Sequence, residues 1–359
     1  MITKHTPFVR LITAVSLIGL LNQPYVHAFG YGDDTKKVLN VYNWANYIPY
    51  DVVHEFEHET GINVNYSEYD SNEMMYAKLK TDPEIGIDIV VPSSYYVQRM
   101  AREGMLLPLD KKQIPNARHI NPALMNREFD PGNQYSLPYI WGATGIVVND
   151  QYFNPNDFTT WSDLWKPDYR GQLLILDDMR EVFSIALIKL GYSVNDSDPS
   201  HIEQAYQELR ALMPNIKLFN TDVQQNIYVD EDARLGLGWN GQTYQAYLEN
   251  THLHFIYPEP TFVLWIDCIA VARYAPHPKY AMQFINFVNR PDIAARIATY
   301  NGFASPNAAG EALQPKAIRE NPMLNPSPEE LKRAVMENDL DTDANALYEK
   351  YWNLLKLGG

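Results

Sequence analysis

Trp265 and Asp267 are the two residues whose types and spacing most directly suggest chemistry. They lie in residues 261–270, a run that follows Pro258 and Pro260 and in which eight of ten residues are apolar. This composition predicts a buried strand. Side chains two apart on a strand share a face, so the indole and the carboxylate point the same way. Such a pair suits an organic cation, although a core tryptophan beside an aspartate satisfied by backbone N–H groups or an arginine is the alternative.

Asp178 and Glu181 form a second candidate site. They follow a predicted strand at residues 173–176 and open a predicted helix at residues 181–190. Asp178 at the N-cap with Glu181 three residues later matches an acidic variant of the capping box, which is a structural role. Asp177 adds a third carboxylate at the C-terminal edge of a strand, where α/β folds bind ligands. The two interpretations are compatible if only one carboxylate oxygen caps the helix.

Five aromatic residues fall at or just after the ends of predicted strands, namely Trp44, Tyr47, Tyr95, Trp239 and Trp265. Any one of them alone would be expected in a hydrophobic core. Five at equivalent positions indicate the walls of a ligand site.

Two other motifs are better explained without a cofactor or a metal. Residues 236–241 match G-x-G-x-x-G, but the match comes late in the chain and puts Trp239 where a pyrophosphate would approach. Residues 339–350 imitate a calcium loop, yet Ala344 and Lys350 stand where that loop needs Gly and Glu, so we expect a solvated acidic stretch. The sequence also shows neither a catalytic triad nor a zinc-binding pattern.

The elements that must position these residues alternate between short apolar strands and amphipathic helices, which predicts an α/β fold with parallel pairing and helices on both faces. The length favours two lobes. Because the chain has no flexible linker, we expect strands near residues 141–145 and 261–270 to cross between the lobes, with a ligand cleft between them.

The N-terminal residues have the pattern of an export signal. Residues 11–21 are an apolar run after Lys4 and Arg10, and Ala28 precedes a plausible cleavage point, so residues 1–28 are predicted to be a secretory signal peptide. No Cys lies near the cut, so we expect no lipid anchor. The formal net charge of −15 becomes −17 on removal of Lys4 and Arg10, because the segment contains no acid. This acidity argues against nucleic-acid and anionic-membrane partners and favours cationic solutes.

Cys268 is the only cysteine, so an intrachain disulfide is excluded. It alternates with Asp267 along the predicted strand and therefore falls on the opposite face, among Leu264 and Ile266. We expect it to be a small buried hydrophobic residue and not a nucleophile.

Five motifs together resemble the periplasmic spermidine/putrescine-binding proteins of polyamine ABC importers, and the resemblance runs from about Leu39 to Lys356. They are residues 42–47 (YNWANY), 91–96 (VPSSYY), 138–144 (PYIWGAT), 239–241 (WNG) and 265–267 (WID). The resemblance implies a type II periplasmic-binding-protein fold, with a ligand cleft at a hinge between two lobes. One lobe would comprise residues 38–142 and 266–311, and the other residues 143–265 and 312–359.

The resemblance also implies roles for single residues. Trp44, Tyr47, Tyr95, Trp239 and Trp265 would line the methylene chain of a polyamine. Ser93 would hydrogen-bond an amine, and Asp178, Glu181 and Asp267 would pair with ammonium groups. The implied partners are spermidine or putrescine and the membrane subunits of an ABC permease. The implied role is binding with no cofactor and no enzymatic activity, and we expect a monomer in the periplasm.

Three positions depart from the family pattern. Asn46 stands where spermidine-preferring members carry an acid, and Phe303 stands where the family has Tyr. Both are still expected to line the ligand site. The family's C-terminal Gln contact aligns with Glu337 or Asn338. The alternatives to polyamine binding are a binding protein for another organic cation or a sugar, and a secreted glycosidase that uses Asp178 or Glu181 with Asp267.

Overall fold

The computed structural model describes residues 37–358, so the predicted signal peptide at residues 1–28 lies outside the described part of the chain. The first group of elements is built around three parallel strands, β1 (Val38–Trp44), β2 (Asn63–Tyr69) and β3 (Ile89–Val90). The helices between and after them are α1 (Tyr50–Thr60), α2 (Asn72–Thr81) and α3 (Ser94–Arg102). This strand–helix alternation confirms the predicted α/β pattern.

The second group repeats the pattern with parallel pairing of β6 to β7 and of β6 to β8. Its strands are β6 (Leu173–Ile175), β7 (Ile216–Phe219) and β8 (Leu235–Trp239). Its helices are α4 (Met179–Leu190), α5 (Pro199–Leu212), α6 (Gln224–Val229) and α7 (Asn240–Glu249). Asp178 caps the N-terminus of α4 and Gly191 caps its C-terminus, as the sequence signals predict.

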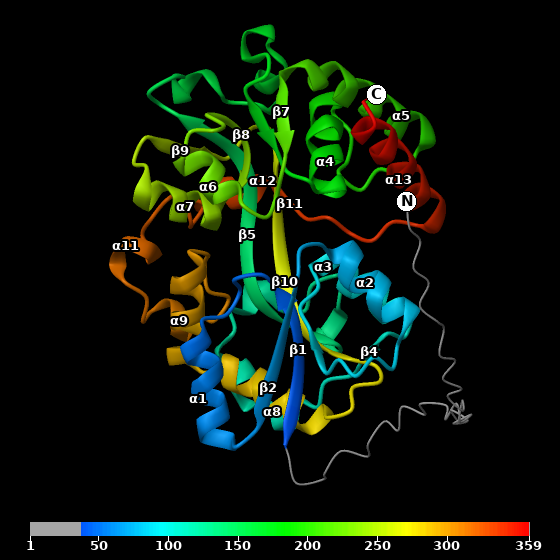
Figure 1. The fold of residues 1–359 in the computed structure, drawn as a ribbon, viewed down its shortest axis with the longest axis vertical. Helices are drawn as coiled ribbons and strands as arrows, with labels where there is room; N and C mark the ends of the chain where they lie inside the picture. The colour runs from blue at the N-terminus through cyan, green and yellow to red at the C-terminus, as the bar shows by residue number, and fades with distance from the viewer. Residues whose placement is uncertain (1–36, 359) are drawn as a thin grey trace, which may run out of the picture. The chain divides into compact units, whose positions relative to one another are not determined.

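Two long antiparallel strands connect the groups, β5 (Ser136–Asn149) and β10 (Phe262–Ala272) (Figure 1). Residues 136–143 of β5 pair with β10, whereas residues 144–149 pair with β8 and with β9 (Leu253–Ile256). β10 in turn pairs with β3, which gives the strand order β2-β1-β3-β10-β5-β8-β6-β7. The two predicted crossing strands are therefore confirmed.

The remaining elements follow β10 or connect the larger ones. They are β4 (Leu106–Leu107), α8 (Pro278–Val288), α9 (Pro291–Asn301), α10 (Ala308–Glu311), α11 (Lys316–Arg319), α12 (Pro328–Arg333), β11 (Ala334–Val335) and α13 (Thr342–Lys356), together with short 3-10 turns. The helices after Pro315 are interrupted, because β11 adds to β10 and is followed by a stretch without helix or strand before α13.

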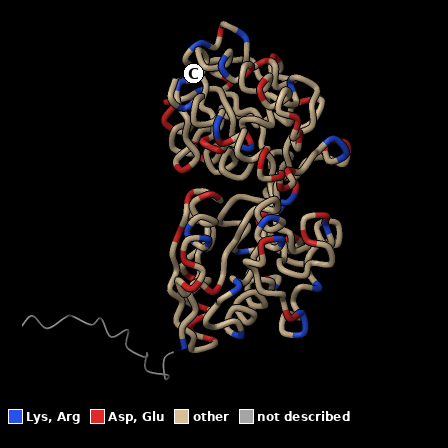
Figure 2. The backbone as a smooth tube through the Cα atoms, turned by 90° about the vertical axis from the view of Figure 1, so that its right-hand side faces the viewer, with Lys and Arg blue, Asp and Glu red and all other residues tan. Residues whose placement is uncertain are grey.

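Asp339, in that stretch, contradicts the expectation that the acidic residues of 339–350 are all solvated. Its side chain is fully buried and forms ion pairs with Arg99 and Arg102 of α3, at 2.8 and 2.6 Å, so this end of the acidic stretch is not solvated. Asp341 caps α13 instead, by accepting a hydrogen bond from the backbone N–H of Ala344. Elsewhere Asp and Glu are spread over both groups of elements (Figure 2).

Separate hydrophobic cores support the two groups. One core gathers side chains of β6, β8, α4, α5 and α13, with Trp161 and Phe183 among its largest buried members. Others lie around β1, β3, α1 and α8, and around the remaining face of β10. Cys268 is buried in the last of these beside Leu264 and Ile266, which confirms its predicted place.

Candidate ligand-binding site

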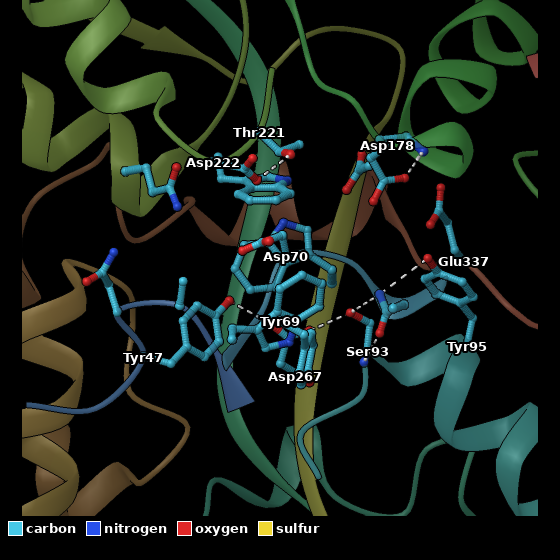
Figure 3. A pocket seen from close by; sticks show the side chains of 18 residues that line it. Tyr47, Tyr69, Asp70, Ser93, Tyr95, Asp178, Thr221, Asp222, Asp267 and Glu337 are labelled. Atoms are coloured by element: carbon cyan, nitrogen blue, oxygen red, sulfur yellow. Dashed lines mark hydrogen bonds between the residues drawn. The ribbon is translucent and has the colours of Figure 1, made fainter. Parts of the chain in front are cut away.

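A cavity lies where β5 and β10 pass between the two groups of elements (Figure 3). Six carboxylates line it: Asp70, Asp178, Glu181, Asp222, Asp267 and Glu337. No Lys, Arg or His stands among its lining residues within 37–358. Six acids with no base in one cavity give a strongly negative local potential, which attracts cations.

Asp267 of β10 is held by two hydroxyl groups. Tyr47 Oη donates to its Oδ2 at 2.7 Å and Ser93 Oγ donates to its Oδ1 at 2.6 Å. The carboxylate is 3 % exposed, and burial raises its pKa to about 6 even though both hydrogen bonds favour the ionised form. Trp265 lines the same cavity, so the predicted shared face of Trp265 and Asp267 is confirmed.

Asn72 completes this arrangement. Its Oδ1 accepts from the backbone N–H of Ser93 at 3.1 Å, and its Nδ2 donates to Ser93 Oγ at 3.0 Å and to Tyr95 Oη at 3.4 Å. Because the only hydroxyl proton of Ser93 is directed at Asp267, Ser93 can offer a ligand only a lone pair in this arrangement. Ser93 therefore positions Asp267 as well as lining the cavity.

The Trp265 indole packs against Gly142 and the ring of Phe303, and Phe303 in turn packs against Gly241. A Cβ at Gly142 would lie 2.5 Å from the indole, and one at Gly241 would lie 2.2 Å from the ring of Phe303. The rings of Trp265 and Phe303 meet edge-on with their centroids 5.1 Å apart. Phe303 is 1 % exposed and does not line the cavity, so it supports Trp265 from behind. The glycine at position 241 of the G-x-G-x-x-G run thus makes room for an aromatic ring.

Three carboxylates converge at one end of the cavity. Glu181 Oε1 accepts from Thr144 Oγ1 at 2.8 Å, and Glu337 Oε1 accepts from Ser184 Oγ at 2.7 Å. Asp178 Oδ1 accepts from the backbone N–H of Glu181 at 3.1 Å, so Asp178 caps α4 with one oxygen and still lines the cavity. Both sequence interpretations of Asp178 are compatible with this geometry. Figure 3 shows Asp178 and Glu337 on one side of the cavity, Tyr47 on the opposite side and Asp267 between them.

Within residues 37–358, none of these three acids forms an ion pair with a Lys, Arg or His side chain. Burial, and then the charges of Glu337 and Asp178, hold the pKa of Glu181 well above its ordinary value. Burial likewise raises the pKa of Glu337 to about 6. The Arg180 guanidinium, whose charge partly offsets the effect of burial on the pKa of Glu337, donates its hydrogen bonds to Asn338 O, Val194 O and Asn195 Oδ1. Glu181 Oε2 is buried and has no hydrogen-bond partner within the described residues. A group that donates hydrogen bonds and carries positive charge would satisfy this end of the cavity.

Aromatic rings form the walls between the acids. Trp44 Nε1 and Tyr69 Oη both donate to Val91 O, at 2.9 and 2.6 Å, which fixes their rings against the cavity. Trp239 and Trp265 meet edge-on with centroids 6.2 Å apart. Trp265 lies inside β10 and not at a strand end as predicted; it reaches the cavity because β10 itself crosses between the groups.

The structure brings together ten of the eleven residues predicted for the site: Trp44, Asn46, Tyr47, Ser93, Tyr95, Asp178, Glu181, Trp239, Trp265 and Asp267. Sequence reasoning missed others, namely Tyr69, Asp70, Asn72, Thr221, Asp222 and Gln242. Trp44 was selected because it lies at the end of a strand. The same criterion, applied to every residue type, would have found the residues that end or follow β2 and β7. Glu337 was identified only as one of two alternatives, because the extended stretch that carries it has no local signal.

Comparison with known proteins agrees with this architecture. Residues 51–326 match the bacterial extracellular solute-binding proteins. The chain belongs to this family. A spermidine/putrescine-binding periplasmic protein of Salmonella typhimurium is 44 % identical, over 89 % of this chain and 92 % of its own length.

Two solved structures share the fold of this solute-binding protein. One, a Listeria monocytogenes protein assigned to spermidine/putrescine ABC transport, superposes with a TM-score of 0.87 at 34 % identity, covering 90 % of this chain and 99 % of its own. The other is the substrate-binding protein of a spermidine/putrescine ABC transporter from Streptococcus pneumoniae, with a TM-score of 0.77 at 33 % identity and the same coverage. The two-lobed α/β fold expected from the sequence is therefore confirmed. Within the described residues, no helix of this solute-binding protein combines the length and apolar character needed to cross a bilayer.

Proposed function

We propose that this solute-binding protein captures linear polyamines, spermidine or putrescine, in the periplasm and delivers them to the membrane subunits of an ABC permease. The observation that carries the proposal is the cavity lined by six carboxylates, no base and several aromatic rings. A polyamine alternates ammonium groups with methylene chains, so it needs spaced anions and apolar walls. The names of the similar proteins point to the same ligands.

The acidic end of the cavity suits a primary ammonium group. Asp178, Glu181 and Glu337 each use one oxygen in a hydrogen bond with the protein, which leaves the other oxygen for a ligand. A primary ammonium has three N–H donors, one for each of these acids. Asp267, which lies between this end and Tyr47, would take a second ammonium along the chain. On this charge count we expect spermidine to bind more tightly than the dication putrescine.

The proposal includes a division into two lobes. One lobe comprises residues 38–142 and 266–311, and the other comprises residues 143–265 and 312–359. β5 supports this division, because it changes its pairing partner after residue 143. Closure of the lobes would remove water from the cavity and strengthen the charge pairing. Small-angle X-ray scattering would then give a smaller radius of gyration with saturating spermidine than without it.

Binding without catalysis is part of the proposal. The carboxylates are fixed by hydroxyl and backbone donors, and the only cysteine is buried away from the cavity. Residues 1–28 are proposed as the export signal, and the mature protein is proposed to work as a monomer with no cofactor.

Isothermal titration calorimetry of the mature protein, residues 29–359, tests the function. The ligands are putrescine, spermidine, spermine, cadaverine and maltose at one salt concentration. The polyamines are expected to bind and maltose is not. Binding of maltose, or of none of the amines, would overturn the proposal.

A further inference from the structure

A second cavity adjoins the cavity described above, hereafter the first cavity, at the end away from Glu337. The two share five lining residues, Ala45, Asn46, Tyr47, Asp222 and Gln242. The second cavity extends from them between the segment around α6 and the end of α9. The shared residues make it a continuation of the first cavity.

The chemistry of the second cavity differs from that of the acidic end. Its polar lining consists mostly of side-chain amides, those of Asn46, Gln225, Asn226, Gln242, Gln245 and Asn301. Among the described residues that line it, Asp222 is the only one with a carboxylate. An amide both donates and accepts hydrogen bonds, whereas an ionised carboxylate only accepts them. The second cavity can therefore satisfy a neutral group that carries both an N–H and a carbonyl. The three carboxylates at the other end would leave the carbonyl of such a group without a donor.

Burial also differs between the two ends. Glu181 and Glu337 are each 5 % exposed, whereas Asn46 and Asp222 are exposed. The acidic end is thus the closed end, and the shared residues lie at an open end. A ligand that is longer or larger at one terminus can be accommodated only if that terminus lies toward the second cavity.

Asn301 lines the second cavity and carries a polar atom without a hydrogen-bond partner in residues 37–358. Its Nδ2 donates to Tyr47 O at 3.0 Å, but its Oδ1 is buried without a hydrogen-bond partner among the described residues. Asn301 is 7 % exposed, so the unpaired oxygen is costly unless a ligand donates to it. An amide N–H or an amine of a ligand would supply that donor.

We propose that the second cavity is a subsite for the far end of a polyamine that is extended or N-acylated there, and that recognition requires only one free primary ammonium. The free ammonium enters the closed end among Asp178, Glu181 and Glu337. The acyl amide, or the additional aminoalkyl segment of spermine, lies among the side-chain amides. This inference rests on the proposed polyamine binding and adds a ligand class to it.

Calorimetry with acetylated spermidines tests the proposal. The ligands are spermidine, the two monoacetylspermidines and the derivative acetylated at both primary amines. At least one monoacetylspermidine is expected to bind within about tenfold of spermidine, and the diacetyl derivative is expected to lose at least about a hundredfold. If the affinity for both monoacetylspermidines is lower than that for spermidine by a hundredfold or more, this inference is overturned and the proposed function stays intact. Absence of spermidine binding would overturn both.

A substitution that fills only the second cavity locates the subsite. Asn226 is exposed on α6 and lines the second cavity but not the first. Asn226→Trp is expected to lower the affinity for monoacetylspermidine by at least about tenfold and the affinity for spermidine by less than about threefold. Leu248→Trp on α7 is the matched control, because Leu248 is exposed and lines neither cavity. Equal effects of Asn226→Trp on both ligands, or no effect on either, would contradict the assignment.

Discussion

Ser184 Oγ in α4 donates a 2.7 Å hydrogen bond to Oε1 of Glu337, a residue of the C-terminal segment. The residues beside Glu337 are held as well. Asn338 O accepts from Arg180 of α4, and Asp339 pairs with Arg99 of α3. These contacts bring a carboxylate from the end of the chain to the closed end of the cavity.

Glu337→Gln is expected to weaken spermidine binding by about tenfold, which is about 1.4 kcal/mol. The substitution keeps the shape of the side chain and an oxygen for Ser184, but it removes one of the three charges at the closed end. Calorimetry measures the loss. Glu329→Gln, at an exposed position of α12, controls for the change in net charge and should have no effect. Unchanged affinity in Glu337→Gln would show that Glu337 does not contact the ligand.

Asp267→Asn is expected to cost more affinity than any other single carboxylate substitution in the cavity. Asp267 is buried, and an amide in its place would turn an N–H₂ group toward the hydroxyl of Tyr47 or Ser93. Removing one partner of a buried charge pair costs about 3–5 kcal/mol. Titration with spermidine should therefore show a loss of at least a hundredfold, against about threefold for Asp222→Asn at the exposed end. A loss below tenfold for Asp267→Asn contradicts the prediction.

The raised pKa values predict opposite pH effects on stability and on binding. Asp267 and Glu337 each have a pKa of about 6 in the folded, ligand-free protein, above their ordinary values near 4. The folded state then binds more protons than the unfolded state between pH 4 and 6. The free energy of unfolding of the ligand-free protein should therefore fall as the pH rises through this window.

Binding should change in the other direction, because a polyamine pairs with ionised acids and must displace their protons at low pH. Spermidine affinity is expected to rise from pH 5 to pH 7. Thermal unfolding scans with and without spermidine at several pH values measure both effects. A ligand-induced increase in Tm that is the same at pH 5 and pH 7 would contradict this prediction.

Asn46→Asp tests the open end of the cavity. The Asn46 backbone has a φ of +59°, a left-handed conformation that Asp tolerates almost as well as Asn. A new charge there should raise spermidine affinity by about threefold to tenfold and leave monoacetylspermidine unchanged or weaker. The neighbouring Glu68 carboxylate, which accepts from the Asn46 backbone N–H at 3.3 Å, limits the gain. Competition titration of the two ligands gives the ratio, and a parallel gain for both would exclude a charged contact at this position.

The sequence by itself determined the class of fold, the crossing strands and part of the cavity. Local patterns carry these features: apolar runs predict β5 and β10, the period of two places Trp265 and Asp267 on one face, and Asp178 and Gly191 mark the ends of α4. The position of aromatic residues after strand ends also depends only on local order. These predictions needed no knowledge of which distant segments meet.

Only the tertiary structure decided the features that depend on distant segments. Phe303, expected at the site, lies outside the first cavity and lines the second, where it packs edge-on against Trp265 and Gly241 makes room for its ring. Ser93 gives its hydroxyl proton to Asp267, 174 residues away in the chain. Glu337 completes the acidic end only because Ser184 and the anchored residues beside it hold an extended segment there. Such contacts arise from packing between elements far apart in sequence, and no local pattern of residues encodes them.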